Sequence, residues 1–299
     1  MKKLVSLLAF ALLIIGLVAP MFGQKLENSL LWEISGNGLS KPSYLFGTYH
    51  LLNDSYLAQK NPKALEVFGK TDGIVVETIV DTPAMMKAQM GMVMLDNKLS
   101  KLLDSFEYQL VKADLQQTMG MDIAMLEQLK PMAIATMLAV TYTSISAPKL
   151  ANYTGQPLDK FFAEEGEKTG KKVQTLETIE EQINILFNHF TLQEQAKILA
   201  EMVAMKERAL DIQKGITASY FSQNIQAMYD LSEQSMKEMP SYGSMDFITT
   251  DRNKRWMEKL PDILKTGNQF IAVGALHLPG PDGLIDLLRK QGYTVKAVQ

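Results

Sequence analysis

Short apolar runs that end in glycine or in a polar residue recur toward both ends of the chain. They occupy residues 30–35, 43–47, 73–78, 171–177, 269–274 and 293–298. Their short length, their β-branched and aromatic content and the turn residues that bound them predict β-strands. The first two runs are separated by Gly36-Asn37-Gly38 and a Lys41-Pro42 step, so we expect them to pair as a hairpin.

Helical periodicity fills the middle of the chain. Predicted helices cover residues 62–70, 83–95, 105–117, 122–143 with a break at Pro131, 158–169, 179–189, 192–215, 216–239 and 283–290, and another begins at Thr249 or Thr250. Thr178, with Glu181 three residues later, predicts a capping box. We therefore predict an α/β (α+β) fold, in which helices cover a central mixed sheet built from both chain ends. Residues 24–299 form a single domain in this prediction, with a helical cap or insert at about 83–170 and 179–240.

The first 23 residues have the pattern of a secretory signal peptide. Lys2 and Lys3 precede an apolar run from Leu4 to Val18, and Pro20 and Gly23 follow, which suits cleavage before Gln24. The run is shorter than the ~20 residues of a comfortable membrane span. We therefore expect a periplasmic or secreted protein without a membrane span in its mature form, and an uncleaved signal anchor is the alternative.

Charge and cysteine content exclude several classes of protein. The formal charge is −3, and removal of Lys2 and Lys3 with the signal peptide takes it to −5. Such a mildly acidic chain, without a basic cluster, is not expected to bind nucleic acid. The chain has no cysteine, which excludes disulfides, thiolate catalysis and a cysteine-linked lipid anchor. The mature chain of roughly 275 residues is long enough to bury a large core.

Two of the three histidines close the same four-residue phrase. The two phrases are Gly47-Thr48-Tyr49-His50 and Gly274-Ala275-Leu276-His277. Each follows a predicted buried strand, so each imidazole lies at the carboxyl end of a strand, where open α/β sheets place ligands and catalytic groups. The repetition indicates a sheet with pseudo-symmetric halves. The alternative explanation of the repeated glycine is that it merely supplies a turn conformation. His189 has no motif around it, and we expect it to be structural.

Glu77 and Glu177 end two other predicted strands. Because a buried carboxylate or imidazole is costly without a partner, we expect these glutamates to share one pocket with His50 and His277. His50, His277 and Glu77 form a standard ligand set for a divalent transition metal such as zinc, manganese or cobalt. Glu77 or Glu177 would act as general base, and Arg252 would stabilise an oxyanion. Taken singly, each glutamate is more often a solvated edge or a helix-cap residue.

At these residues the chain resembles the TraB/GumN family, which is related to the TIKI metalloproteases. The matching segments are 31–34, 42–51, 75–77, 176–182, 252–253 and 272–278, with Gly280 and Gly283. The resemblance implies the fold of the erythromycin-esterase and ChaN-like group. It also implies active-site roles for His50, His277, Glu77 and Arg252, with Glu177 as a further candidate.

The leading hypothesis is therefore a secreted or periplasmic metal-dependent hydrolase, in the first place a peptidase acting on a peptide or protein substrate. The alternative is a non-catalytic protein that binds haem, iron or a peptide in the same pocket, as the ChaN-like relatives suggest. A third hypothesis is a degenerate scaffold, in which the polar residues only stabilise the ends of the strands. The sequence leaves the substrate, the metal and the oligomeric state open.

Overall fold

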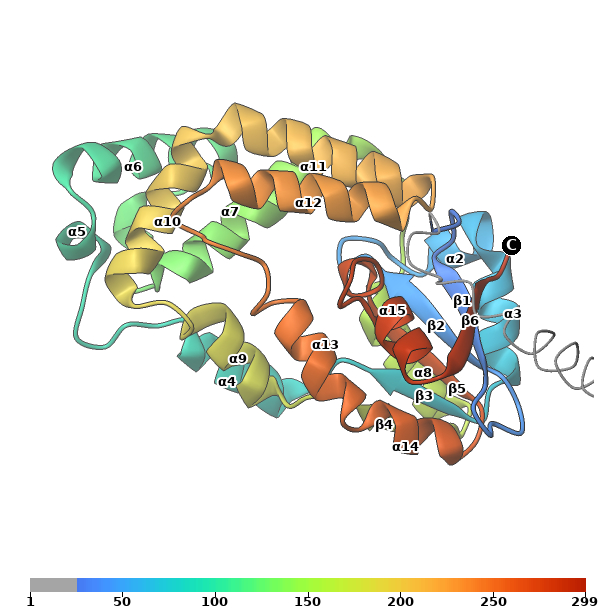
Figure 1. Ribbon diagram of the computed structural model, residues 1–299. Coiled ribbons are helices and arrows are strands. Elements are labelled where there is room, and N and C mark those ends of the chain that lie inside the picture. Colours follow the sequence, from blue (N-terminus) through green and yellow to red (C-terminus); the bar gives the residue numbers. More distant parts are fainter. Residues whose placement is uncertain (1–25) are drawn as a thin grey trace, which may run out of the picture.

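A six-stranded mixed sheet forms one side of the molecule, and a block of helices forms the other (Figure 1). The computed structural model describes residues 26–299, so the predicted signal peptide lies outside the described residues. The strands are β1 (Leu31–Gly36), β2 (Ser43–Thr48), β3 (Gly73–Val76), β4 (Lys172–Thr175), β5 (Gln269–Gly274) and β6 (Tyr293–Ala297). Their order in the sheet is β4-β3-β5-β2-β1-β6. The predicted α/β class with a mixed sheet is confirmed.

Four neighbouring strands of this sheet run in the same direction. β4 pairs in parallel with β3, β3 with β5, and β5 with β2. β1 pairs antiparallel with β2, as the predicted hairpin requires, and β6 pairs antiparallel with β1. β5, from the carboxyl-terminal part of the chain, therefore lies between β3 and β2 from the amino-terminal part, β4 comes from the middle of the chain, and the carboxyl ends of all four strands meet at one edge. The pseudo-symmetry of the two halves stays a prediction.

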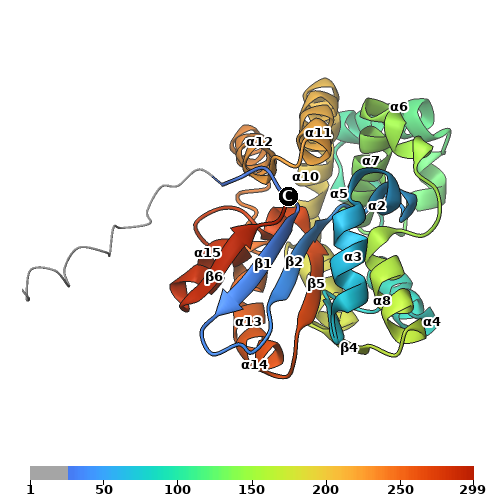
Figure 2. The ribbon, with the colours of Figure 1, turned by 90° about the vertical axis from the view of Figure 1, so that its right-hand side faces the viewer.

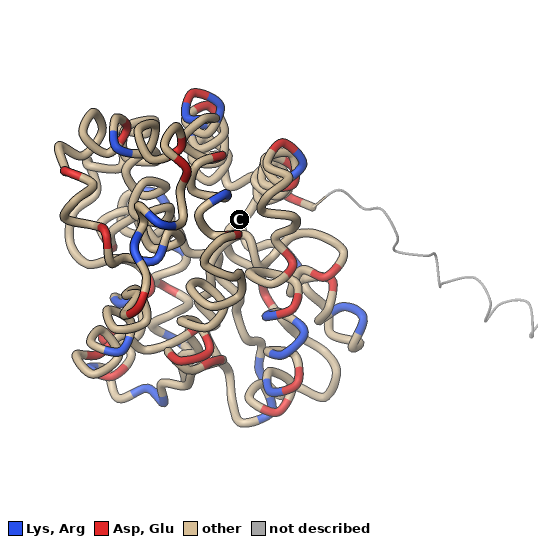
Figure 3. The backbone as a smooth tube through the Cα atoms, turned by 90° about the vertical axis from the view of Figure 1, so that its left-hand side faces the viewer, with Lys and Arg blue, Asp and Glu red and all other residues tan. Residues whose placement is uncertain are grey.

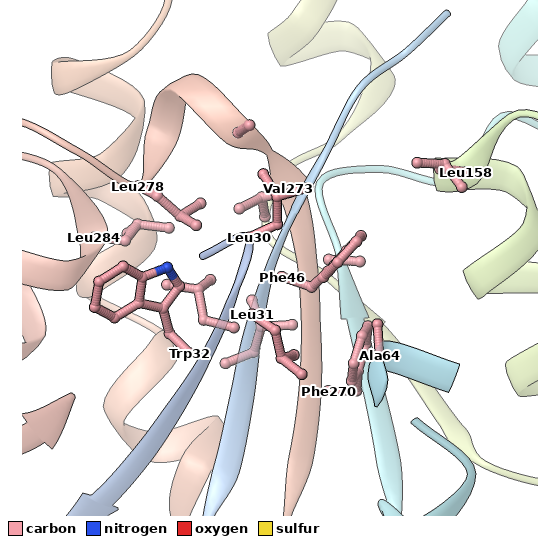
Figure 4. Packing of buried hydrophobic residues seen from close by; sticks show 14 of the residues in the cluster. Leu30, Leu31, Trp32, Phe46, Ala64, Leu158, Phe270, Val273, Leu278 and Leu284 are labelled. Carbon is pink, nitrogen blue, oxygen red and sulfur yellow. The ribbon is translucent and has the colours of Figure 1, made fainter. Parts of the chain in front are cut away.

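Helices cover both faces of the sheet (Figure 2). The helices that pack beside the sheet are α2 (Ser55–Lys60), α3 (Pro62–Lys70), α8 (Leu158–Lys168), α13 (Thr250–Met257), α14 (Leu260–Lys265) and α15 (Leu284–Lys290), with the 3-10 turns η2 (Pro148–Asn152) and η3 (Ala275–His277). Trp32 and Leu284 pack on one face, whereas Ala64, Phe46 and Phe270 pack on the other (Figure 4). Apolar side chains bury both faces of the central strands, which accounts for the continuous apolar runs in the sequence.

The helical block has a hydrophobic cluster of its own. Its elements are α4 (Thr82–Gly91), α5 (Leu99–Leu102), α6 (Ser105–Met119), η1 (Ile123–Leu126), α7 (Pro131–Ser146), α9 (Ile179–Phe187), α10 (Leu192–Ala204), α11 (Lys206–Phe221) and α12 (Ile225–Glu238). The second cluster joins buried residues of α6, α7 and α10, including Val111, Leu138 and Leu199. Ile216 and Met228, on α11 and α12, belong instead to the cluster of the sheet. The predicted insert thus divides between two cores.

The helix boundaries between residues 192 and 239 differ from the sequence prediction. The predicted helix 192–215 is interrupted at Met205, and a new helix begins at Lys206. Gly215 does not end a helix: a Cβ there would lie 3.0 Å from Leu231, so this glycine lets α11 approach α12 closely. The break comes later, where Asn224 caps α12 by accepting the Ala227 N–H. The predicted boundary at Gly215 was therefore wrong.

Two predicted helix starts are confirmed in position. Pro131 opens α7, and Thr178 with Glu181 forms the capping box of α9. Thr249 precedes α13, but its hydroxyl donates to the Met245 carbonyl and does not cap the helix.

The surface carries both charge signs along the same segments (Figure 3). Basic and acidic residues alternate along the helices, and many are paired at helical spacing, such as Lys70 with Glu66 and Lys290 with Asp286. Within residues 26–299, no helix has both the length and the apolar character needed to cross a membrane.

Candidate active site

The site residues predicted from the sequence lie at the carboxyl edge of the parallel strands. Glu77 directly follows β3, and Glu177 lies two residues after β4. His277 ends the η3 turn that follows β5, and His50 lies two residues after β2. Arg252 reaches this edge from the first turn of α13. The strand order therefore places side chains that are far apart in the sequence along one edge of the sheet.

The two Gly-x-x-His turns pack directly against each other. In the parallel register Gly47 lies opposite Val273, and Thr48 opposite Gly274. A Cβ on Gly47 would lie 3.0 Å from the Cα and Cβ atoms of Ala275. Neither motif glycine has a positive φ. A left-handed turn is therefore not what requires these glycines: Gly47 provides space, because the Ala275 backbone approaches too closely for a side chain, whereas Gly274 faces the side chains of Glu77, His277 and His50.

Arg252 is the centre of a buried ionic cluster. Its Nη2 donates to both Glu77 and Glu177, and its Nε donates to Glu177 at 3.1 Å. Its Nη1 donates to the Ile248 carbonyl at 3.0 Å and to Nε2 of His277 at 3.1 Å. All five N–H donors of the guanidinium are thus engaged. In this arrangement Arg252 holds its neighbours in place, and the oxyanion role expected from the sequence would require one of these bonds to be released.

The cluster carries an excess of negative charge. Glu77, Glu177 and Arg252 are 8%, 4% and 7% exposed, so two buried carboxylates share one guanidinium. Glu177 has further donors in the indole N–H of Trp256 and the amide of Gln182. Burial of an unmatched charge is unfavourable, so the cluster favours the approach of a further cation.

Asn253 and Trp256 fix the orientation of His277. Nδ1 of His277 lies 2.7 Å from Oδ1 of Asn253, whose amide nitrogen donates to the carbonyls of His277 and Asp282. Since that oxygen accepts, Nδ1 of His277 is the protonated nitrogen, and Nε2 presents its lone pair toward Arg252 and Glu77. The Trp256 ring packs on the imidazole with centroids 4.4 Å apart. Nε2 lies 3.8 Å from Oε1 of Glu77.

His50 lies in a different environment from His277. Its side chain is 69% exposed, whereas that of His277 is buried. Nδ1 of His50 lies 2.7 Å from Oδ2 of Asp159 on α8, and Oδ1 of the same carboxylate accepts from the Thr48 hydroxyl at 2.5 Å. Two further bonds tie this turn to α11: Tyr220 donates to the Gly47 carbonyl, and the hydroxyl of Tyr49 contacts that of Thr217.

The three predicted metal ligands converge on the space beside Gly274. A Cβ built on Gly274 would lie 3.3 Å from Oε1 of Glu77, 3.5 Å from Cδ2 of His277 and 3.8 Å from Nε2 of His50. The Gly274 N–H also donates to Oε1 of Glu77 at 2.7 Å. Across residues 26–299, however, no three His, Asp or Glu side chains are already arranged as around a bound ion. In this arrangement Arg252 holds the lone pair of His277 and the second oxygen of Glu77.

Burial and charge shift the pKa values of the site in different directions. Burial would raise the pKa of Glu77, but the neighbouring His277, Arg252 and His50 and the Gly274 N–H bond lower it to about 2. Burial is the main cause that lowers the pKa of His277 to about 3, since the nearby Glu77 only partly opposes it. The charge of Asp159 raises the pKa of His50 to about 9. At neutral pH the metal-free site therefore contains a carboxylate at Glu77, a neutral imidazole at His277 and a protonated imidazole at His50, which must lose a proton before it can bind a metal.

These shifts predict an acid-sensitive stability. His277 has a lowered pKa in the folded protein, so its contribution is complete above the unfolded value of 6.5 and is lost as the pH falls toward about 3. We expect the unfolding free energy of the metal-free protein to fall in this window, by up to about 1.4 kcal/mol per pH unit from this residue. Urea unfolding at a series of pH values measures the slope of the unfolding free energy against pH. A His277→Gln variant should show a shallower slope between pH 6.5 and 4.5, and an equal slope would contradict the assignment.

The structure adds residues that the sequence prediction missed. Asp159, Asn253 and Trp256 contact His50, His277 and Glu177, respectively. Asn253 and Trp256 share helix α13 with Arg252. Asn253 lies in the matching segment 252–253, and Trp256 follows Arg252 at i+4 spacing, but the sequence prediction assigned neither residue a role in the site. Asp159 lies on a helix predicted for packing alone. The ring of His189, by contrast, stacks on Phe247 at 3.9 Å, which agrees with its predicted structural role.

A known protein family matches nearly the whole described length of the chain. The sequence model of the TraB/PrgY/gumN family matches residues 30–297, which include every strand and every site residue described above. The metalloprotease TIKI2 of Danio rerio is 23% identical over 324 residues, covering 91% of this chain and 61% of the relative, so the chain spans about three fifths of that protein's length. No solved structure matches. The chain belongs to the TraB/PrgY/gumN family.

Proposed function

We propose that this protein is a metal-dependent hydrolase that cleaves peptide bonds, and that it acts in the periplasm or outside the cell. The observation that carries the proposal is the convergence of His50, Glu77 and His277 on the space beside Gly274. This space lies at the carboxyl edge of a parallel sheet, where α/β proteins place their ligands. The exposed His50 side chain shows that solvent reaches the site from one side.

The donor set fits a divalent transition metal. Two imidazoles and a carboxylate suit zinc, manganese or cobalt, and the absent Cβ of Gly274 leaves space between them. The unmatched negative charge of Glu77, Glu177 and Arg252 favours a cation. His50, His277 and Glu77 would hold it, after Arg252 releases Nε2 of His277. Such a metal, when bound, lowers the pKa of a water molecule and polarises a carbonyl.

The lowered pKa of Glu77 supports one of its two predicted roles. A carboxylate with a pKa of about 2 binds cations well and accepts a proton weakly at neutral pH. We therefore assign Glu77 to holding the cation and orienting water. Glu177 and Arg252 keep Glu77 ionised and fix its direction, since the guanidinium bridges both carboxylates.

The choice of a peptide substrate rests on the similarity to a protein described as a metalloprotease. The proposed location rests on the signal-peptide pattern of residues 1–23. The site itself supports hydrolysis in general, because the chemistry that a metal held by His50, His277 and Glu77 would supply serves for esters as well as amides.

A Gly274→Ala variant tests the proposal with little disturbance of the fold. Gly274 has φ −51° and ψ 134°, which alanine adopts freely, but the new methyl group would occupy the space between the three ligands. We expect at least a tenfold loss of peptide cleavage and of zinc affinity, with a small change in melting temperature. Gly69→Ala is the matched control, because nothing lies within 4 Å of that Cβ position and no loss is expected.

The assay compares stripped and zinc-reconstituted protein on a peptide library, read by mass spectrometry. The proposal predicts cleavage only by the reconstituted protein. Equal cleavage by stripped and reconstituted protein would contradict it, as would full activity of Gly274→Ala. Zinc binding without cleavage of any peptide would favour the alternative, a binding protein.

A further inference from the structure

We infer that Asp159 is a positioning residue that aims Nε2 of His50 at the space beside Gly274. The inference rests on the proposed metal-binding role of His50 and adds to it a residue outside the predicted set. Asp159 touches neither Glu77 nor His277 through a hydrogen bond, so it acts through His50 alone.

The Asp159 carboxylate is itself held in one place. Its Oδ1 accepts from the buried Thr48 hydroxyl, and its Oδ2 faces Nδ1 of His50 at 2.7 Å. It lies in the first turn of α8, which is anchored by the fully buried Leu158 and Phe162 against the sheet. The Leu158 N–H also donates to the Leu52 carbonyl, just after the His50 turn. Each oxygen of the carboxylate therefore has one partner and a fixed direction.

His50 depends on this carboxylate more than His277 depends on any one neighbour. The imidazole of His277 is buried, packs on Trp256 and is fixed by Asn253. The imidazole of His50 is 69% exposed, and among residues 26–299 its contact with Asp159 is the only hydrogen bond that its ring makes. Packing does not hold the His50 rotamer, so the Asp159 contact has to do so.

The contact also decides which ring nitrogen is free to bind a metal. With Nδ1–H donating to Asp159, the lone pair of the neutral ring is on Nε2, which lies 3.8 Å from the Cβ position of Gly274. A carboxylate behind a metal-binding imidazole fixes its tautomer and orientation, and loss of such a partner typically weakens metal affinity 10- to 100-fold. An exposed ion pair of this kind contributes little to folding stability. Replacement of Asp159 by asparagine, which keeps an acceptor for the buried Thr48 hydroxyl, should therefore affect the site with little effect on the fold.

The first experiment titrates zinc into stripped wild type, Asp159→Ala and Asp159→Asn by calorimetry. We expect the Kd of Asp159→Ala to be about 10- to 100-fold weaker, and that of Asp159→Asn to lie between, since asparagine keeps an acceptor without the charge. The melting temperature of stripped Asp159→Asn should stay close to wild type, and that of Asp159→Ala should fall modestly, because the buried Thr48 hydroxyl loses its acceptor. Asp72→Asn is the control: it removes the charge of an exposed carboxylate paired with Lys41, at the opposite end of β3 from Glu77, and should leave the zinc Kd unchanged.

The second experiment needs no metal. At a pH above the titration of His50, nitrogen NMR of the stripped protein reports which ring nitrogen carries the proton, and a His50→Ala spectrum assigns the signals. Wild type should have the proton on Nδ1, and Asp159→Ala should move it largely to Nε2.

The outcomes separate the inference from the proposed function. If wild type binds zinc and Asp159→Ala binds it within about twofold, the positioning role is wrong and the metal site stands. If wild type binds no metal, the proposed function fails, and the NMR comparison decides the positioning role alone: an unchanged tautomer overturns it, and a moved proton supports it.

Discussion

Replacement of Arg252 by methionine is expected to lower the unfolding free energy of the metal-free protein by about 3–5 kcal/mol. The guanidinium is the shared partner of two buried carboxylates, and its removal leaves Glu77 and Glu177 charged in a site that water barely reaches. Loss of one partner from a buried ionic cluster costs far more than the cluster contributes as a whole. Urea unfolding of stripped protein at neutral pH measures the difference.

Arg208→Met is the matched control for this prediction. Arg208 also makes a bidentate ion pair with a carboxylate, that of Glu238, but the two side chains are 40% and 31% exposed, respectively. Its loss should cost less than about 1 kcal/mol. Adding Glu177→Gln to Arg252→Met should restore part of the stability, because one of the two unmatched charges is then gone. Losses of equal size for Arg252→Met and Arg208→Met would contradict the ionic cluster.

Replacement of Glu77 by glutamine is expected to lower kcat/KM for a cleaved peptide by about 10²-fold or more. Glutamine keeps an oxygen that can accept the Gly274 N–H, but it removes the negative charge that faces His50 and His277. The change should also weaken zinc affinity. It removes a partner of Arg252 without leaving a new buried charge, so the fold should persist and circular dichroism should be unchanged.

Glu180→Gln is the control for Glu77→Gln. Glu180 is an exposed carboxylate at the start of α9 that pairs with Lys87, and it lies three residues beyond Glu177. Its replacement should leave kcat/KM and zinc affinity unchanged. Retention of wild-type activity by Glu77→Gln would exclude Glu77 from the reaction, whatever its effect on stability.

The sequence predicted, for a physical reason, that the site residues lie at one edge of the sheet. A strand buried on both faces is a continuous apolar run, so a charged residue or a histidine at its end is conspicuous. Glu77, His50 and His277 have this signature, whereas Glu177 follows β4, a polar and partly exposed strand at the edge of the sheet. Parallel strands then bring such ends together without further information.

The supporting residues and several boundaries were not predictable in the same way. Asp159 is an ordinary acidic residue in the first turn of an amphipathic helix, and only the packing of α8 on the sheet brings it to His50. Gly215 has the appearance of a helix stop, whereas its role is close contact with Leu231. The reason for Gly47 and Gly274 could not be predicted either, because a glycine required for space and a glycine required for a turn conformation are identical in sequence.

The zinc content of the protein tests the central claim most directly. Stripped wild type and His277→Ala are incubated with excess zinc, freed of unbound ion and analysed for metal per chain. We expect close to one zinc per chain for wild type and little for His277→Ala, because the buried Nε2 of His277 is one of the three proposed ligands. Equal zinc in the two proteins, or none in wild type, would contradict a metal site at His50, Glu77 and His277.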